Sequence, residues 1–253
     1  MQDISFDLET LGLKQDAMIL AIGAVKFDRK TGEISEQFYQ AVDITAPVGG
    51  GTIDAGTVYW WMNQPAAARS AIFDDSEEAK TERVDLRQAL VKFSEFIGFN
   101  DDLAEGEYPD VALWQRGDKD GQWLESAYQG MGLALPFRYW QLKDERTLTE
   151  LFKPIKPIKP MRFGVHHNAL DDAIYQAQCL CNVFARLYSV QAFVAEGPVE
   201  RHYPAGATHT DGLGTYYILA EPGKEDGTAL MWANGKWETT ECSGAWAARL
   251  TRV

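Results

Sequence analysis

Cysteine is scarce in this sequence, and long apolar runs are absent. Only three cysteines occur in 253 residues. Cys179 and Cys181 stand two positions apart in a helix-like segment, where their side chains point in different directions, so neither a disulfide framework nor a zinc site is indicated. No window of about 18 uncharged apolar residues occurs, and the chain begins with a charged, strand-like segment instead of a signal peptide. We therefore expect a soluble, cytoplasmic protein with no membrane partner.

Positive charge is also in short supply. The chain has 24 Lys and Arg against 37 Asp and Glu, a formal net charge of −13. A field of this sign repels polyanions, so a nucleic-acid partner would have to be held by bound cations and local basic patches. The most basic stretch is KPIKPIKPMR, from Lys153 to Arg162. Its prolines predict an extended segment, which is either a stiff connector or a contact for a phosphate backbone.

Strand-like and helix-like segments alternate along most of the chain. Short apolar runs predict strands, and apolar residues three to four positions apart predict helices. The expected strands are Ile4–Leu8, Met18–Phe27, Ile34–Val42 and Val111–Trp114, and the expected helices are Thr57–Phe73 with a break at Pro65, Leu86–Ile97, Trp123–Met131 and Ala169–Tyr188. This alternation predicts an α/β fold, or a mixed α+β sheet domain.

The composition changes near residue 195. Beyond it Gly, Thr, Tyr and Trp prevail, no helix pattern is present, and Asn234-Gly235 is a strong hairpin signal. We therefore place the main domain at residues 1–194 and a small β-rich C-terminal appendage at 195–253. An appendage this short is marginal as an independent unit, so we expect it to pack on the main domain.

Two carboxylates, Asp7 and Glu9, stand on the first predicted strand. Residues two apart on a strand share a face, so both carboxylates project together from a segment that otherwise favours burial. Two like charges so placed repel each other. A divalent cation such as Mg²⁺ or Mn²⁺ would remove that penalty, because these ions prefer oxygen ligands. The alternative is an exposed strand end with two solvated acids.

A histidine and an aspartate stand close together at the start of the last predicted helix. Asn168 suits the N-cap position, which puts Asp172 in the first turn and His167 on the loop just before it. This helix entry offers a metal ligand and a titratable base. Alternatively, Asp171 and Asp172 only complement the helix dipole, and His166 and His167 are surface residues.

Both segments resemble motifs of a nuclease family. FDLET, from Phe6 to Thr10, resembles the first motif of the DEDDh 3′–5′ exonucleases, which include polymerase proofreading subunits and RNase T; HNALDD, from His167 to Asp172, resembles the third. The Trp60-Trp61 pair and the Arg146-Thr147 pair are most similar to phage-encoded exonuclease A and the related 3′–5′ exoribonuclease-like domains. The resemblance covers roughly residues 1 to 188.

The family also requires a middle aspartate that opens a helix, and two aspartates compete for this place. Asp120 has Leu124 four residues on, as the family pattern asks, whereas Asp118 suits an N-cap. Lys119 stands where Phe is usual in the family, and the spacing from Gly117 is short. We choose Asp120, and Asp118 stays open as the alternative ligand.

The resemblance implies an RNase H-like exonuclease domain and a metal-dependent reaction. Asp7, Glu9, Asp120 and Asp172 would hold two Mg²⁺ or Mn²⁺ ions, which stabilise in-line phosphoryl transfer. His167 would take a proton from the attacking water. The substrate would be single-stranded 3′ ends of DNA or RNA, and the product a nucleoside 5′-monophosphate.

Three residues are candidates for contact with the substrate. Thr10 follows the first strand and is placed to meet the terminal nucleotide. Arg146 suits pairing with a phosphate, or support of the acidic cluster. Trp61, together with Trp60, either stacks on a base or packs in the core.

Two other functions stay open. One is a catalytically inactive nucleic-acid or protein binding module on the same fold, which the altered middle motif favours. The other is an enzyme restricted to short oligonucleotides, which the acidic composition favours. The choice between DNA and RNA and the oligomeric state are left open. A phage-encoded protein would act in the host cytoplasm.

Overall fold

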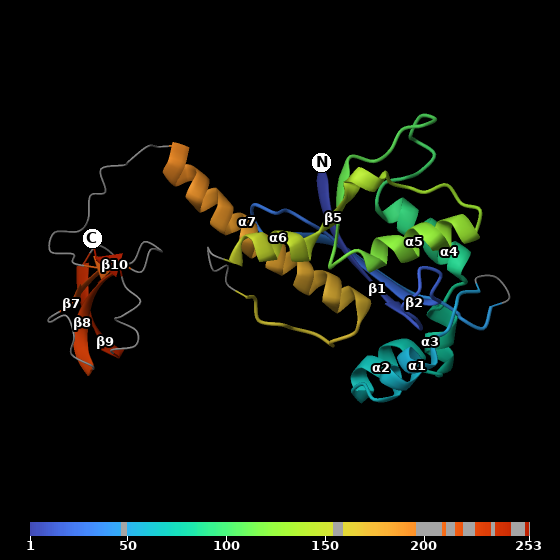
Figure 1. Cartoon of the computed structure of the whole chain (residues 1–253), viewed down its shortest axis with the longest axis horizontal. Coiled ribbons are helices and arrows are strands. Elements are labelled where there is room, and N and C mark those ends of the chain that lie inside the picture. The colour runs from blue at the N-terminus through green and yellow to red at the C-terminus, as the bar shows by residue number, and fades with distance from the viewer. Residues whose placement is uncertain are drawn as a thin grey trace. The chain divides into compact units, whose positions relative to one another are not determined.

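The computed structural model describes residues 1–46, 50–153, 159–195, 209–210, 216–219, 226–233, 236–243 and 251–252, with side chains as far as residue 188. The chain divides into two compact units, Met1–Gln191 and Ala192–Val253 (Figure 1). Across this described part of the chain, no helix is long and apolar enough to cross a membrane.

The first unit is built on a five-stranded mixed sheet with the order β3-β2-β1-β4-β5. Strands β1, β2 and β3 form the antiparallel meander that the sequence predicts, and β4 and β5 continue the sheet in parallel with β1. The strands are β1 Gln2–Thr10, β2 Ile19–Phe27, β3 Ile34–Ala41, β4 Val111–Gln115 and β5 Leu142–Asp144. The predicted mixed α/β class is confirmed.

Seven helices and one short 3-10 helix are described in this unit, and the last helix extends beyond its end at Gln191. They are α1 Ala55–Met62, α2 Ala66–Phe73, α3 Glu77–Glu82, α4 Leu86–Phe96, α5 Lys119–Gly130, η1 Tyr139–Gln141, α6 Glu145–Leu151 and α7 Ala169–Ala195. The predicted break at Pro65 separates α1 from α2. The sequence did not predict α3, α6 or β5. Helix α3 has no apolar face, and β5 is only three residues long.

The two faces of the sheet are covered by different helices (Figure 1). Ile4, Phe6 and Leu8 of β1 pack against α4 and α5 in the largest core cluster. On the opposite face, Val25 of β2 and Trp114 of β4 pack against α6 and α7. Alternation along β1 therefore directs its odd-numbered side chains, including Asp7 and Glu9, towards the face that α7 covers.

A glycine in β2 allows α7 to begin directly against the sheet. Gly23 pairs with Asp7 of β1, and a Cβ atom at this position would lie 2.2 Å from the Ala169 carbonyl carbon and 2.3 Å from the Leu170 nitrogen. Only glycine permits so close an approach between backbones. The first turn of α7 is thereby brought close to Asp7.

The second unit contains a five-stranded sheet with the order β10-β6-β7-β8-β9. Its strands are β6 His209–Thr210, β7 Tyr216–Leu219, β8 Asp226–Ala233, β9 Lys236–Ser243 and β10 Thr251–Arg252. Strands β8 and β9 pair antiparallel up to Ala233 and Lys236. Asn234 and Gly235, the predicted turn between them, lie outside the described residues.

Candidate metal and catalytic site

The acidic face of β1 lies under the first turns of α7. Asp7 is partly buried, and its Oδ1 accepts a hydrogen bond of 2.7 Å from Nε2 of Gln176 on α7. Glu9, two residues on, is 7% exposed. The predicted pair therefore lies at the boundary between strand and helix, and the alternative of two freely solvated acids is excluded by this burial.

Asp120 is brought to the same place by the start of α5. It is 6% exposed, and its Oδ1 accepts a 3.0 Å hydrogen bond from the backbone nitrogen of Leu8. Asp118 is exposed at the N-cap position, but its side chain caps no backbone group and instead accepts a 2.9 Å bond from Gln122. The geometry therefore brings Asp120, not Asp118, beside the two carboxylates of β1.

The start of α7 supplies the remaining predicted residues. Oδ1 of Asn168 accepts bonds of 3.1 and 3.2 Å from the backbone nitrogens of Leu170 and Asp171, so Asn168 is the N-cap that the sequence predicts. Asp172 follows in the first turn. Ligand oxygens of Asp7, Glu9 and Asp172 all lie within 4.8 Å of one another.

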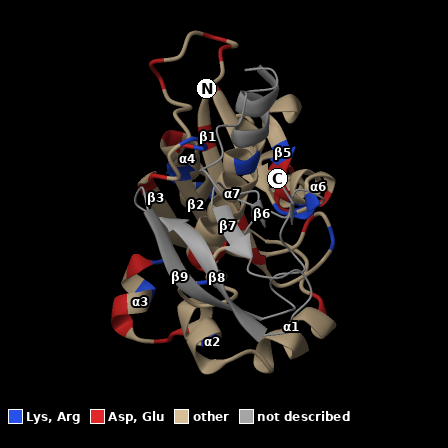
Figure 2. Ribbon diagram, turned by 90° about the vertical axis from the view of Figure 1, so that its left-hand side faces the viewer, with Lys and Arg blue, Asp and Glu red and all other residues tan. Residues whose placement is uncertain are grey.

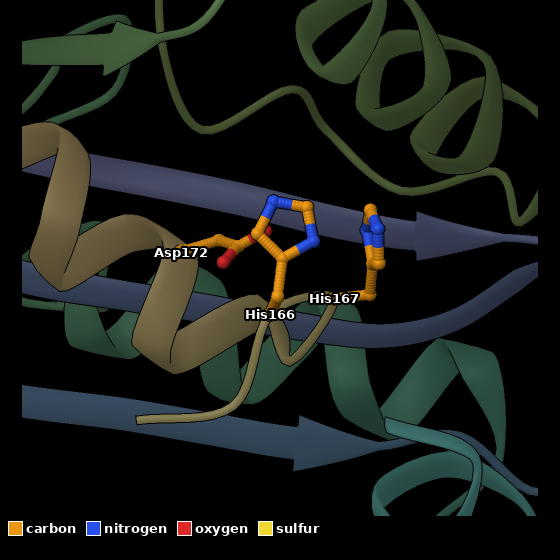
Figure 3. Close-up of side chains that lie close together, drawn as sticks. All are labelled: His166, His167 and Asp172. Atoms are coloured by element: carbon orange, nitrogen blue, oxygen red, sulfur yellow. The ribbon is translucent and has the colours of Figure 1, made fainter. Parts of the chain in front are cut away.

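Asp172 also belongs to a second group of potential ligands, with His166 and His167. Figure 3 shows the two imidazoles on the loop before α7 and the carboxylate on the helix, with the ring of His166 between the other two side chains. The ligand atoms of this group likewise lie within 4.8 Å of one another. Asp172 is thus the residue that joins the acidic cluster to the histidines.

The backbone of His167 has an unusual conformation. Its φ of 65° is the one positive value at a non-glycine residue in the part of the chain described here. Its ring lies edge-on to Trp60, with centroids 4.7 Å apart, and 3.8 Å from the ring of His166. Left-handed backbone at a non-glycine residue is uncommon and concentrates at functional sites.

Burial and mutual repulsion raise the pKa values of the clustered carboxylates. The pKa of Asp7 is raised well above its ordinary value, first by burial and then by the charges of Asp120 and Glu9. Burial, and then Asp120, raise the pKa of Glu9 to about 8. Burial also raises the pKa of Asp120 to about 7. The carboxylates are therefore held together at an electrostatic cost that a cation would relieve.

The donor set fits a hard divalent cation. Its members are carboxylate oxygens, which suit Mg²⁺ and Mn²⁺. A cationic group already stands among them, since the guanidinium of Arg162 forms an ion pair with Asp172 and lowers the pKa values of Asp7 and Glu9. The chemistry of the donors and the presence of this positive group both indicate a cation-binding site.

The environment of His167 keeps its imidazole neutral. Burial, His166 and Arg162 lower the pKa of His167 to about 4. At neutral pH the ring therefore carries one free nitrogen lone pair and can accept a proton.

The predicted substrate contacts have different positions. Thr10 is 7% exposed, and its hydroxyl donates a 2.8 Å bond to the Gly12 carbonyl. Trp61 is 2% exposed in a core cluster and donates from Nε1 to the Thr10 carbonyl at 3.0 Å. Burial of this extent favours core packing, one of the two alternatives for Trp61, over stacking on a base. Arg146 is exposed on α6, with its guanidinium beside Gly117.

A pocket of about 490 Å³ opens beside Glu9. Trp60, which is 41% exposed, forms part of its wall. The pocket is lined by Leu8, Glu9, Thr10, Leu13, Asp54, Gly56, Thr57, Trp60, Trp61 and Trp123. The end of β1 and helix α1 thus form much of the pocket wall.

Three residues near the cluster were missed by the sequence analysis. Arg162 was only the last residue of the basic run, and His166 was considered only as a surface residue. Gln176 stands four positions after Asp172, which places the two on the same face of a helix. This spacing was the one available signal for Gln176.

Known proteins resemble the chain in sequence and in fold. The model of the 3′-5′ exoribonuclease Rv2179c-like domain family matches residues 2–184. Among curated proteins, none matched the chain. The structure of E. coli Exonuclease I in complex with a 5cy-dT13 oligonucleotide has a TM-score of 0.50 and 11% identity, over 91% of this chain and 54% of that chain. This chain thus matches about half the length of Exonuclease I.

Two further solved structures are less similar in overall superposition. The nuclease domain of 3′hExo, a DEDDh family member, bound to rAMP has a TM-score of 0.45 and 16% identity, over 71% of this chain and 90% of that chain. The Mg²⁺- and Mn²⁺-bound form of S. pombe Pop2p has a TM-score of 0.45 and 12% identity, over 78% and 86% of the two chains.

The predicted RNase H-like exonuclease fold is confirmed by the strand order and by the likeness to Exonuclease I. The family match covers the sheet and every predicted site residue. Since that match spans most of the sequence, the chain belongs to the 3′-5′ exoribonuclease Rv2179c-like domain family, and it is a 3′–5′ exonuclease.

Proposed function

We propose that this exonuclease uses Asp7, Glu9, Asp120, Asp172 and His167 to hydrolyse the terminal phosphodiester bond of a nucleic acid and release a nucleoside 5′-monophosphate. The observation that carries the proposal is that carboxylate oxygens of Asp7, Glu9 and Asp172 lie within 4.8 Å of one another, with Asp120 of α5 close enough for its charge to raise the pKa values of Asp7 and Glu9. These elements are far apart in the sequence, and the charge of Asp120 on α5 adds to the electrostatic cost of Asp7 and Glu9 on β1.

Asp7, Glu9, Asp120 and Asp172 would hold the metal. Two Mg²⁺ or Mn²⁺ ions bound there would stabilise the negative charge that develops on the attacking and leaving oxygens. Gln176 fixes one oxygen of Asp7, which leaves the other oxygen available as a ligand. The Leu8 nitrogen fixes Asp120 in the same way.

His167 would act as the general base. A water molecule would attack the terminal phosphorus, and its proton would pass to a neutral nitrogen of His167. The bond from phosphorus to the 3′ oxygen would break, and that oxygen would take a proton from solvent to leave as the 3′ hydroxyl of the shortened strand. The lowered pKa of about 4 keeps this nitrogen unprotonated at neutral pH. The edge contact places the imidazole against Trp60, one of the residues that line the pocket.

The pocket beside Glu9 would receive the terminal nucleotide of a single-stranded 3′ end. Its volume of about 490 Å³ lies in the range of small-ligand sites. Trp60 offers the exposed ring on which a base can stack, in place of Trp61. The family description names exoribonucleases, which supports RNA as the first substrate to test, with DNA as the second.

A restriction to short oligonucleotides is the second candidate. The net charge of −13 favours it, and acidic side chains are spread over several elements, with Glu77, Glu78 and Glu82 on α3 (Figure 2). Repulsion of a long polyanion grows with the number of phosphates near the surface. Comparison of strands of increasing length at low and high salt tests this candidate.

The proposed function is tested with RNA and DNA oligonucleotides labelled at either end, in Mg²⁺, Mn²⁺ or EDTA. We expect a metal-dependent ladder that shortens from the 3′ end. The ladder should disappear in Asp7→Asn and Asp120→Asn and persist in the matched control Asp118→Asn. Binding without cleavage in either metal would refute catalysis and favour the inactive binding module. Loss of the ladder in Asp118→Asn alone would reverse the assignment of the middle ligand.

A further inference from the structure

Arg162 stands on the loop that leads into α7. Its guanidinium forms an ion pair with Oδ1 of Asp172, the residue shared by both groups of potential ligands. The guanidinium also lies over the ring of Tyr175, 4.6 Å from its centroid. The side chains of Arg162 and Asp172 are 28% and 16% exposed. The ion pair is therefore a partly buried part of the site.

The acidic cluster concentrates negative charge in this small volume. Arg162 is the positive group that lowers the pKa of both Asp7 and Glu9, while burial and neighbouring carboxylates raise them. A guanidinium close to several carboxylates offsets part of their repulsion. In the protein without metal, Arg162 thus acts as a counter-ion to these carboxylates.

We propose that Arg162 is a tethered counter-ion of the metal site, which occupies Asp172 when metal is absent and must leave it when divalent cations bind. This inference rests on the proposed metal site and concerns its regulation. A guanidinium and a metal ion cannot both use Oδ1 of Asp172, and their positive charges repel each other. Arg162 therefore raises the metal concentration at which the site fills.

The loop geometry allows Arg162 to leave without moving His167. Gly164 lies between them with a φ of 82°, and a side chain there would collide with the Asp171 carboxylate. On the far side of Gly164, the Val165 nitrogen donates a 2.6 Å bond to Oδ2 of Asp171. The segment that carries His167 is thus fixed to α7 by contacts that do not involve the Arg162 side chain.

Calorimetric titration of the full chain with Mn²⁺ tests the proposal. Replacement of Arg162 by Gln removes the competitor, so we expect Mn²⁺ to bind at least about fivefold more tightly than in the wild type. Arg162→Lys keeps the charge and should remain within about threefold of the wild type. The matched control, Lys159→Gln, removes one positive charge from an exposed position on the same loop and should change the affinity less than about twofold.

Equal or weaker Mn²⁺ binding in Arg162→Gln, with Lys159→Gln unchanged, would overturn the proposal. If Arg162→Gln does not fold, NMR of the wild type decides. The Nε–H signal of Arg162, assigned by its loss in Arg162→Lys, should shift on addition of Mg²⁺, and a signal that stays in place at saturating Mg²⁺ would refute the displacement. Failure of the wild type to bind either metal would instead refute the proposed metal site.

Discussion

The two faces of β1 have opposite roles in this protein. On one face Ile4, Phe6 and Leu8 are at most 5% exposed and pack against α4 and α5. On the other face Asp7 and Glu9 meet α7, and both have raised pKa values. Apolar burial stabilises the fold from the first face, whereas burial of charge on the second face opposes it.

A single strand therefore anchors the fold through one face and carries the electrostatic cost of the candidate site on the other. Successive side chains along a strand point to opposite faces, so the two roles are separated within one strand. The acidic face is held in place from outside β1, by the close contact of Gly23 with the start of α7 and by the hydrogen bond from Gln176 to Asp7. Each face can be changed without the other, which makes the comparison testable.

The largest expected effect comes from Asp7→Asn, on the acidic face. Changes to groups that only support a metal ligand cost about 10- to 100-fold in activity, so loss of the ligand itself should cost more than about 100-fold. The variant should also unfold at a higher temperature than the wild type in EDTA at pH 8, because it removes a buried charge. Exonuclease assays and thermal unfolding measure the two effects.

The sign of the stability effect follows from the raised pKa of Asp7. An acid with a raised pKa in the folded state contributes stability below its unfolded pKa and loses it as the pH rises towards the folded value. The advantage of Asp7→Asn over the wild type should therefore shrink at pH 4 and grow towards pH 8. A constant difference across this range would contradict the assigned burial of charge.

Phe6→Ala breaks the apolar face and should have the next largest effect. Phe6 is fully buried and contacts Phe93, with ring centroids 6.1 Å apart. Truncation of such a side chain costs about 3–5 kcal/mol in the free energy of unfolding. Denaturant unfolding at pH 7 measures the loss. At temperatures well below its unfolding transition, Phe6→Ala should bind metal as tightly as the wild type. Loss of metal affinity under these conditions would show that the acidic face depends on the apolar face.

The dependence of activity on pH and metal should be moderate in size. In the proposed metal site, Glu9 and Asp120, with pKa values of about 8 and about 7, would have to lose their protons before they bind a cation. The acidic limb of the activity profile should therefore move by about one pH unit to lower pH for each tenfold rise in Mg²⁺, if each ion displaces one proton. An acidic limb that stays fixed as Mg²⁺ rises would show that another group causes it. His167, with its pKa of about 4, should not limit activity near neutral pH.

The sequence predicted most of the sheet because its strands follow one another locally. The meander of β1 to β3 and the helices with clear apolar stripes, such as α4, need only local patterns. β5 was missed because three residues carry too short a pattern, and its pairing with β4 is set by the fold. Apolar spacing alone places the start of α5 at Trp123, whereas the helix begins at Lys119, directly after Asp118, which the sequence indicates as suited to an N-cap.

The candidate site was predicted from motif residues, and its supporting residues were not. Asp7, Glu9 and Asp172 lie together, which the family resemblance implied; local patterns placed only Asp7 beside Glu9 and Asp172 in the first turn of a helix. Arg162 and Gln176 reach the carboxylates only through tertiary contacts, which one sequence does not reveal. The burial of Trp61 next to the exposed Trp60 likewise depends on which face of α1 meets the core.

The smallest effect is expected at Ser5, which is polar and lies on the same face of β1 as Asp7. Its hydroxyl is fully buried and has no hydrogen-bond partner among the described residues. Removal of an unsatisfied buried hydroxyl relieves a desolvation penalty of about 1–3 kcal/mol, set against the loss of a small packing contribution. Ser5→Ala should therefore raise the free energy of unfolding by up to about 1 kcal/mol and leave exonuclease activity within experimental error. A clear loss of activity would show that the whole polar face of β1, and not the carboxylates alone, maintains the site.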